Sequence, residues 1–160
     1  MDKIKTIEEL ACIVDELRSE GKKIVTTNGV FDLLHVGHVR YLQAAKKLGD
    51  VLIVGINSDS STKAVKGSNR PIVPQSERAE VLAALACVDY VFIFNERDPR
   101  WFTEKLRPDI HVKASDYRLE DVIEAPIVKK YGGEVKLVEF TRGYSTSKII
   151  EKIVRKYSKE

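Results

Sequence analysis

Short apolar, β-branched runs alternate with segments of helical periodicity along this chain. Five runs have the length and composition of buried strands, at 23–28, 51–57, 90–94, 109–113 and 134–140. The segments between them carry apolar residues at three- and four-residue spacing, which is typical of helices that pack on a sheet. Strands that alternate with helices form βαβ units with right-handed crossovers. The sequence therefore predicts an α/β fold with a parallel sheet covered by helices on both faces.

Caps and stop signals mark the expected helices. Thr6 and Glu9 form a capping box ahead of an apolar stripe, and Gly21 ends the helix that they begin. Pro99 occupies the first position of a second helix, which is expected to start at Asp98. Further helices are expected at 36–48, 75–86, 119–131 and 145–157.

Length and charge limit the classes of function. A chain of 160 residues can bury a substantial core, so we expect residues 1–160 to form a single domain with helix 6–20 as an added element. The net charge of +3 is too small to predict nucleic acid binding and favours anionic ligands only weakly.

Cysteine usage and hydropathy indicate the compartment. Cys12 and Cys87 are not in a CxxC pair, so we expect two buried free thiols rather than a disulfide framework or a zinc knuckle. No apolar run reaches the length of a membrane span, and the N-terminus lacks the apolar region of a signal peptide. We therefore expect a cytoplasmic protein without a membrane partner.

In parallel α/β sheets, ligands bind beyond the carboxyl ends of the strands. Chemistry is therefore expected in the segments 28–38, 57–70, 95–99, 114–117 and 141–147. Neither GxxxxGK[ST] nor GxGxxG follows a strand, which argues against a P-loop NTPase and against a dinucleotide-binding domain.

The first of these segments carries two histidines at the start of a helix. Helix N-termini attract phosphate, and residues three apart lie together on the first turn, so His35 and His38 could both face a bound anion. Imidazole donates hydrogen bonds and can be charged near neutrality, especially beside a polyphosphate. Gly37 would let a ligand touch the backbone, and Gly29 would let the chain turn and a ligand approach.

The histidine pair has two other interpretations. Zinc needs three or four protein ligands, and neither cysteine lies in a suitable place, so a zinc site is disfavoured. Two ordinary cap or surface histidines remain an open alternative for the pair alone.

Two further segments add polar groups at the same sheet edge. TRGYSTSKII (141–150) opens a helix with three hydroxyls, and although Ser145 alone would suffice as a cap, the cluster predicts a second phosphate-binding wall. VKGSNRP (65–71) predicts a mobile basic loop with Lys66 and Arg70, although most basic loops are merely solvated and Lys63 competes for the same role.

These motifs resemble those of a known family. GVFDLLHVGH (29–38) resembles the His-x-Gly-His signature of the nucleotidyltransferase superfamily that includes cytidylyltransferases and adenylyltransferases, and RGYSTSKII (142–150) resembles its second signature. Residues 20–155 resemble the adenylyltransferase domain of bacterial bifunctional heptose-phosphate kinase/adenylyltransferases. The resemblance implies a Rossmann-like three-layer sandwich with a five-stranded, mostly parallel sheet. Because 160 residues leave no room for a kinase domain, we expect a stand-alone adenylyltransferase.

Two positions depart from the family pattern. The family usually has Lys-Gly-Gly-Asp-Tyr where this chain has KASDY (113–117), and an acidic pair is expected where Thr141 and Arg142 stand. Both changes lie where acceptor or base recognition is expected.

The resemblance implies transfer of AMP from ATP, with Mg²⁺, to a sugar 1-phosphate, with release of pyrophosphate. The expected acceptor is D-glycero-β-D-manno-heptose 1-phosphate, which would give ADP-heptose. The alternatives are a cytidylyltransferase acting on glycerol 3-phosphate or a related alcohol phosphate, and a non-catalytic nucleotide-binding regulatory domain. Members of the family often dimerise, so a homodimer is also expected.

The resemblance also implies roles for individual residues. The expected catalytic residues are His35, His38 and Lys66. The expected nucleotide-binding residues are Asn28, Gly29, Phe31, Gly37, Arg142, Gly143, Tyr144, Ser145, Thr146 and Ser147. The expected acceptor-binding residues are Asp32, Arg70, Lys113 and Asp116, and no resident metal site is expected.

Overall fold

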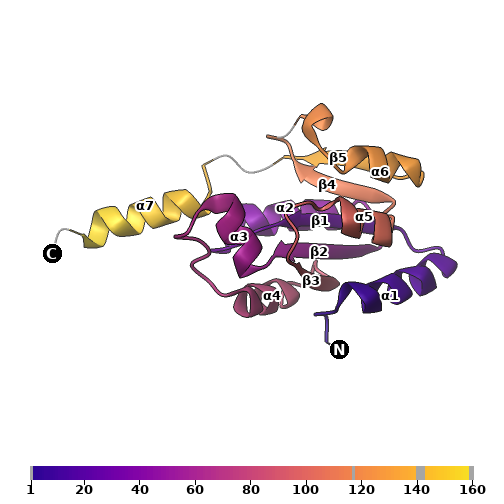
Figure 1. Ribbon diagram of the computed structural model, residues 1–160, viewed down its shortest axis with the longest axis horizontal. Coiled ribbons are helices and arrows are strands. Elements are labelled where there is room, and N and C mark those ends of the chain that lie inside the picture. The colour runs from indigo at the N-terminus through magenta and orange to yellow at the C-terminus, as the bar shows by residue number, and fades with distance from the viewer. Residues whose placement is uncertain (1, 117, 140–142, 159–160) are drawn as a thin grey trace.

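A computed structural model describes residues 2–116, 118–139 and 143–158. Its centre is a five-stranded sheet in the order β3-β2-β1-β4-β5 (Figure 1). The strands are β1 (Ile24–Gly29), β2 (Val51–Asn57), β3 (Tyr90–Phe94), β4 (Ile110–Ala114) and β5 (Glu134–Val138). Every neighbouring pair is parallel. The predicted α/β fold with a five-stranded parallel sheet is confirmed.

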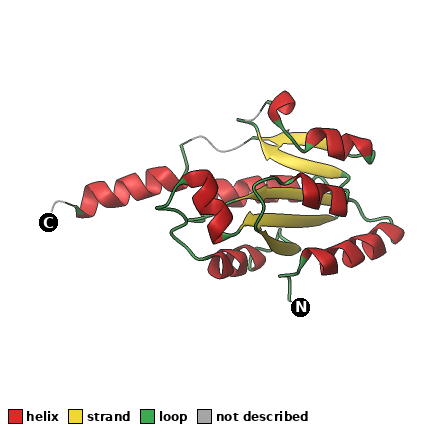
Figure 2. Ribbon diagram, in the orientation of Figure 1, coloured by secondary structure: helices red, strands yellow, loops and turns green. Residues whose placement is uncertain are grey.

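Helices cover both faces of the sheet, as Figure 2 shows. The helices α2 (Val36–Lys46) and α4 (Gln75–Ala83) bury Leu42 and Leu82 against one face, where they pack in a core with Val54. The helices α1 (Ile7–Ser19) and α5 (Arg100–Leu106) pack on the other face, in a second core that includes Phe92 and Phe102. Alternate strand residues point to opposite faces, so β1 and β2 contribute to both cores.

The predicted capping box of α1 is confirmed. The Thr6 hydroxyl accepts from the amide of Glu9 at 3.2 Å, and the Glu9 carboxylate accepts from the amide of Thr6 at 2.7 Å. Other boundaries shift slightly: α4 ends at Ala83 rather than at residue 86, and α5 begins after Pro99.

Two predictions of secondary structure were wrong. The helix expected at 119–131 is split into a 3-10 turn (η1, Leu119–Asp121) and α6 (Ala125–Lys130), because Pro126 is tolerated only in the first turn of a helix. The segment after β2, expected as a loop, contains α3 (Asp59–Lys66). Ser58 caps α3 by accepting from the amide of Ser61, but the helix has too few apolar residues to show a stripe.

The last helix, α7 (Thr146–Tyr157), differs from the others because it extends away from the sheet (Figure 1). Thr146 is its one buried residue among those described, and residues 151–158 are exposed. Its apolar side includes Ile153, Val154 and Tyr157, which are 49%, 56% and 75% exposed.

Two remaining expectations concern the cysteines and the membrane. Cys87 is half-buried, but Cys12 is exposed, so the prediction of a buried thiol was wrong at Cys12. Within the described ranges, no helix combines the length and the apolar character that a membrane span requires.

Candidate functional site

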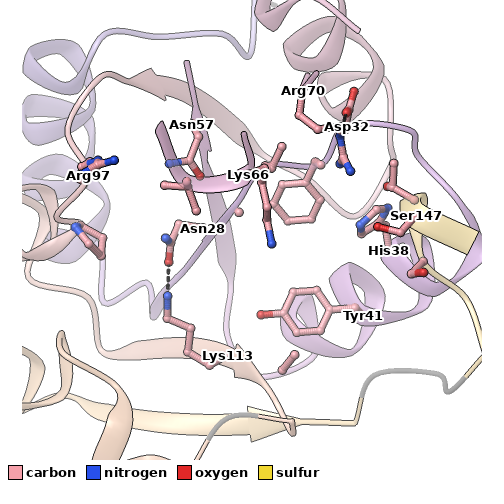
Figure 3. A pocket seen from close by; sticks show the side chains of 18 of the residues that line it. Asn28, Asp32, His38, Tyr41, Asn57, Lys66, Arg70, Arg97, Lys113 and Ser147 are labelled. Atoms are coloured by element: carbon pink, nitrogen blue, oxygen red, sulfur yellow. Dashed lines mark hydrogen bonds and ion pairs between the residues drawn. The ribbon is translucent and has the colours of Figure 1, made fainter. Parts of the chain in front are cut away.

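A pocket of about 550 Å³ opens at the carboxyl ends of the strands (Figure 3). Its walls come from the segments that follow β1, β2, β3 and β4 and from the first turn of α7. Twelve of the predicted site residues line it: Asn28, Gly29, Phe31, Asp32, His35, His38, Lys66, Arg70, Lys113, Ser145, Thr146 and Ser147. The pocket thus lies at the sheet edge where chemistry was expected.

The other predicted residues lie elsewhere. Gly37 is buried and does not line the pocket. Gly143, Tyr144 and Asp116 are exposed and do not line it either. Arg142 falls outside the residues that the structure describes.

His35 and His38 lie against each other at the N-terminus of α2. Their rings stack with centroids 3.8 Å apart and planes 24° apart, and Phe31 lies 5.2 Å from His38 between centroids. The amide of His35 donates to Nδ1 of His38 at 3.4 Å. A ring nitrogen that accepts carries no proton, so the neutral ring of His38 has its proton on Nε2.

Burial changes the protonation expected of this pair. It lowers the pKa of His35, and burial together with the neighbouring His35 lowers the pKa of His38 to about 4. Without a ligand, both rings are therefore neutral at pH 7. Neutral imidazoles still donate hydrogen bonds, and a bound polyphosphate would raise both pKa values.

The two glycines of this segment make room for neighbouring aromatic rings. A Cβ on Gly37 would lie 2.9 Å from Nδ1 of His35, so Gly37 makes room for the His35 ring rather than for a ligand. The sharp turn after β1 is made by Phe31, which has φ +48°, and a Cβ on Gly29 would lie 3.0 Å from its ring. Gly29 thus allows Phe31 to fold back beside the histidines.

The first turn of α7 forms the wall beside the histidines. The Ser145 hydroxyl caps the helix by accepting from the amide of Lys148 at 3.1 Å. The Thr146 hydroxyl donates to the carbonyl of Leu33 at 3.3 Å and so joins α7 to the segment between β1 and α2. Two helix N-termini from opposite ends of the chain therefore border the same pocket, and unpaired amides at such ends attract anions.

Asp32 holds the basic loop that follows α3. Its carboxylate pairs with Nε of Arg70 at 2.5 Å and accepts from the amides of Ile72 and Val73 at 2.9 Å. Burial acts to raise the pKa of Asp32, but the Val73 and Ile72 amides and Arg70 outweigh it and lower the pKa. Both carboxylate oxygens are thus engaged within the protein, and Arg70 is fixed at the pocket wall.

Arg78 is a buried residue that sequence reasoning missed. Its guanidinium donates to the carbonyls of Val73 and Val30 at 2.9 and 2.6 Å, and it pairs with Asp59 at 2.8 Å. It therefore ties the basic loop, the turn after β1 and the start of α3 together. The sequence does not reveal the burial of Arg78, because exposed arginines are common on amphipathic helices.

Lys113 marks the end of the pocket that is nearest to β4. Its ammonium donates to Oδ1 of Asn28 at 2.6 Å, a contact drawn in Figure 3, and pairs with Oε1 of Glu124 at 2.6 Å. Figure 3 places this end away from His38 and Ser147, with Lys66 between them. The pocket therefore has a histidine end and a lysine end.

Several lining residues were not among the predicted ones. Asn57 ends β2 and Arg97 follows β3, in segments where chemistry was expected, but neither belonged to a recognised motif. Glu124 was assigned to the interior of a helix that does not form as predicted. Its only signal was its position after the fourth strand.

The described residues offer little for binding a metal directly. No group of three His, Cys, Asp or Glu side chains that could hold an ion is found within the described ranges. Both oxygens of Asp32 are engaged with Arg70 and two amides. A Mg²⁺ ion at this site would thus be held by the phosphates and water that accompany it.

Comparisons with known proteins identify the family of this chain. The family model for cytidylyltransferase-like domains matches residues 26–152. The chain is 52% identical to the bifunctional protein HldE of Geobacter metallireducens over 99% of its length, and 50% identical to that of Geobacter sulfurreducens. It covers 32% of each of these proteins, so it spans about a third of the length of the curated relatives it matches.

Solved structures show the same fold. The lipopolysaccharide core biosynthesis protein of Thermoplasma volcanium is 32% identical, with a TM-score of 0.63 over 78% of this chain and 100% of that one. The pantoate-beta-alanine ligase of Francisella tularensis shares the fold at 16% identity, with a TM-score of 0.62 over 100% of this chain and 80% of that one. The family model covers most of the chain, and the motifs meet in one pocket. The chain therefore belongs to the cytidylyltransferase-like family.

Proposed function

We propose that the protein is a nucleotidyltransferase that transfers AMP from ATP to a sugar 1-phosphate. The observation that carries the proposal is the meeting of the histidine pair of α2 with the Ser-Thr-Ser turn of α7 in one pocket. Two helix N-termini and two imidazole donors suit a triphosphate. A site for an uncharged ligand would not need these anion-binding groups.

The acceptor that we propose is D-glycero-β-D-manno-heptose 1-phosphate, which would give ADP-heptose. The support is the resemblance of residues 20–155 to heptose-phosphate adenylyltransferase domains, the identity to the HldE proteins, and the likeness to a lipopolysaccharide core biosynthesis protein. The volume of the pocket lies within the usual range for small-molecule sites.

The proposed reaction is direct transfer. An oxygen of the acceptor phosphate attacks the α-phosphorus of ATP, and the bond from that phosphorus to the bridging oxygen of pyrophosphate breaks. A phosphate nucleophile is already ionised at neutral pH, so the reaction needs no protein base. Catalysis then consists of positioning the reactants and of stabilising the charge that develops on the phosphates.

Each part of the pocket has a role in this proposal. His35 and His38 donate to phosphate oxygens, and Ser145 and Thr146 present the α7 turn to the β- and γ-phosphates. Lys66, in the last turn of α3, is exposed and lines the pocket, so it can close over the phosphates. Asp32 acts through Arg70, which it fixes. Mg²⁺ enters with ATP and supplies countercharge to its phosphates.

The remaining predicted residues complete the proposal. We assign Asn28, Gly29, Phe31 and Ser147 to the nucleotide. Gly37, Gly143 and Tyr144 support the two helix ends. We assign Lys113 and Asp116 to the acceptor. We propose that residues 1–160 form one nucleotidyltransferase domain, that the protein works in the cytoplasm, where ATP is available, and that it forms a homodimer that does not require nucleic acid.

A substrate panel tests the proposal. Pyrophosphate release would be measured with ATP or CTP against heptose 1-phosphate, glycerol 3-phosphate and related phosphates, with sedimentation to give the oligomeric state. We expect release with ATP and the heptose phosphate. Release only with CTP and an alcohol phosphate would identify a cytidylyltransferase instead. Nucleotide binding without release from any pair would indicate a non-catalytic domain.

A further inference from the structure

A column of buried and half-buried polar side chains runs between β1 and β4 and ends in the pocket. Thr26 and Asn28 are two residues apart on β1, and His111 and Lys113 are two apart on β4, so all four share one face of the sheet. Thr26 pairs with His111 in the register of the two strands. Glu124, just before α6, lies over this face and is 1% exposed.

The contacts within the column are continuous. Oγ1 of Thr26 lies 2.8 Å from Nδ1 of His111, whose Nε2 lies 3.4 Å from Oε1 of Glu124. The same carboxylate oxygen lies 2.6 Å from Nζ of Lys113, which donates to Oδ1 of Asn28 at 2.6 Å. The column therefore leads from a fully buried threonine to an ammonium group in the pocket wall.

The charges in this column are defined by its surroundings. Burial acts to raise the pKa of Glu124, but the neighbouring His111 and the charge of Lys113 outweigh it and lower the pKa to about 2. Burial and the charge of Lys113 lower the pKa of His111 despite the neighbouring Glu124. At neutral pH, a carboxylate thus faces the lysine, with a neutral imidazole behind it.

Stability alone gives a poor account of this arrangement. A buried ion pair adds little net stability, because the desolvation of both charges offsets their attraction. Apolar side chains of similar volume would fill the same space between β4 and α6 at a lower cost. What they would not supply is a cation held at a fixed point in the lysine end of the pocket.

We propose that Glu124 is a positioning residue, which fixes the ammonium of Lys113 for the phosphate of the acceptor. His111 and Thr26 in turn fix Glu124. The inference rests on the proposed function: the histidine end takes the triphosphate of ATP, and the lysine end takes the second anion that the reaction requires. Glu124 itself touches neither substrate.

Kinetics of Glu124→Gln give the first test, because glutamine keeps the size of the side chain and removes its charge. We expect the KM for the acceptor to rise about tenfold, with kcat and the KM for ATP within about twofold of wild type. Glu124→Asp should recover part of the loss. Glu120→Gln is the matched control, since Glu120 is an exposed carboxylate of the same segment that pairs with Arg118. An unchanged KM in Glu124→Gln would overturn the proposal.

A double-mutant cycle tests whether Glu124 acts through Lys113. In a Lys113→Met background, Glu124→Gln should raise the KM for the acceptor by less than twofold, since the group that it positions is gone. A tenfold rise in that background would show that Glu124 acts independently and would contradict the proposal. Melting temperatures of all variants separate such effects from a loss of folded protein.

A measurement without turnover separates this inference from the proposed function. Lysine labelled with ¹³C at Cε reports the mobility of each side chain by NMR, and Lys113→Met identifies the signal of Lys113. We expect a restrained signal in the wild type that becomes mobile in Glu124→Gln and stays restrained in Glu120→Gln. Equal restraint in wild type and Glu124→Gln would overturn the positioning role. Loss of the proposed function alone would leave this mobility change intact and show in the substrate panel.

Discussion

The two helices that begin at the pocket, α2 and α7, are supported in opposite ways. Gly37, Tyr41, Leu42 and Ala45 of α2 are buried, so the whole helix is held against the sheet. Among the described residues of α7, Thr146 alone is buried, and residues 151–158 are exposed. One wall of the proposed phosphate site thus belongs to the core, while the other depends on the contacts of a single turn.

This difference predicts unequal responses to truncation of apolar side chains. Leu42→Ala removes a fully buried side chain of α2, so we expect a loss of about 2–5 kcal/mol in the free energy of unfolding. Ile153→Ala, its match on α7, should change this free energy by less than about 0.5 kcal/mol, because Ile153 is half exposed. Urea unfolding measures both. A cost for Ile153→Ala close to that of Leu42→Ala would show that α7 is packed against something in solution.

The rigid wall should carry the larger share of catalysis. His38→Ala removes a donor that burial holds in place, and such donors contribute about 2.7–4 kcal/mol to transition states, so kcat should fall about a hundredfold or more. Pyrophosphate release gives the rate. Gln43→Ala is the control, since Gln43 is exposed on the same helix. Turnover of His38→Ala near that of the wild type would refute the assigned role.

The burial of His38 also predicts a dependence of stability on pH. Its pKa is about 4 in the folded protein and about 6.5 in the unfolded chain, so only the unfolded chain binds this proton between those values. The contribution of neutral His38 to the free energy of unfolding is complete above pH 6.5 and is lost as the pH falls toward 4. Between pH 7 and pH 5, the wild type should lose about 2 kcal/mol more than His38→Gln, as measured by urea unfolding. Parallel losses in the two proteins would show that His38 is not neutral in the folded state.

A modest effect is expected at the contact that attaches α7. Thr146→Ala removes the hydrogen bond to Leu33, which is worth about 0.5–1.5 kcal/mol, so the KM for ATP should rise by about tenfold or less. Ser158→Ala is the matched control at the other end of α7, where the hydroxyl donates to the carbonyl of Val154. If both variants bound ATP equally well, the first turn of α7 would not need this contact.

Much of the fold follows from local patterns. The strands at 51–57 and 90–94 have the predicted bounds, because β-branched runs of that length have few alternatives. The capping box of Thr6 and Glu9 depends only on residue types at a three-residue spacing, so it could be predicted from the sequence. Prediction from the sequence was wrong where a helix lacks an apolar stripe, as in α3. It was also wrong where Pro126 divides a segment that otherwise has a helical pattern.

The sequence by itself determined that the histidine pair and the Ser-Thr-Ser cluster begin helices at the same sheet edge. Parallel strands all end at that edge, so this conclusion needs no knowledge of strand order. Only the tertiary structure decided that β4 lies beside β1, which joins His111 to Thr26 and Lys113 to Asn28. Burial by residues distant in the sequence likewise made His38 neutral and turned Glu124 into the partner of Lys113, and no local pattern reports such burial.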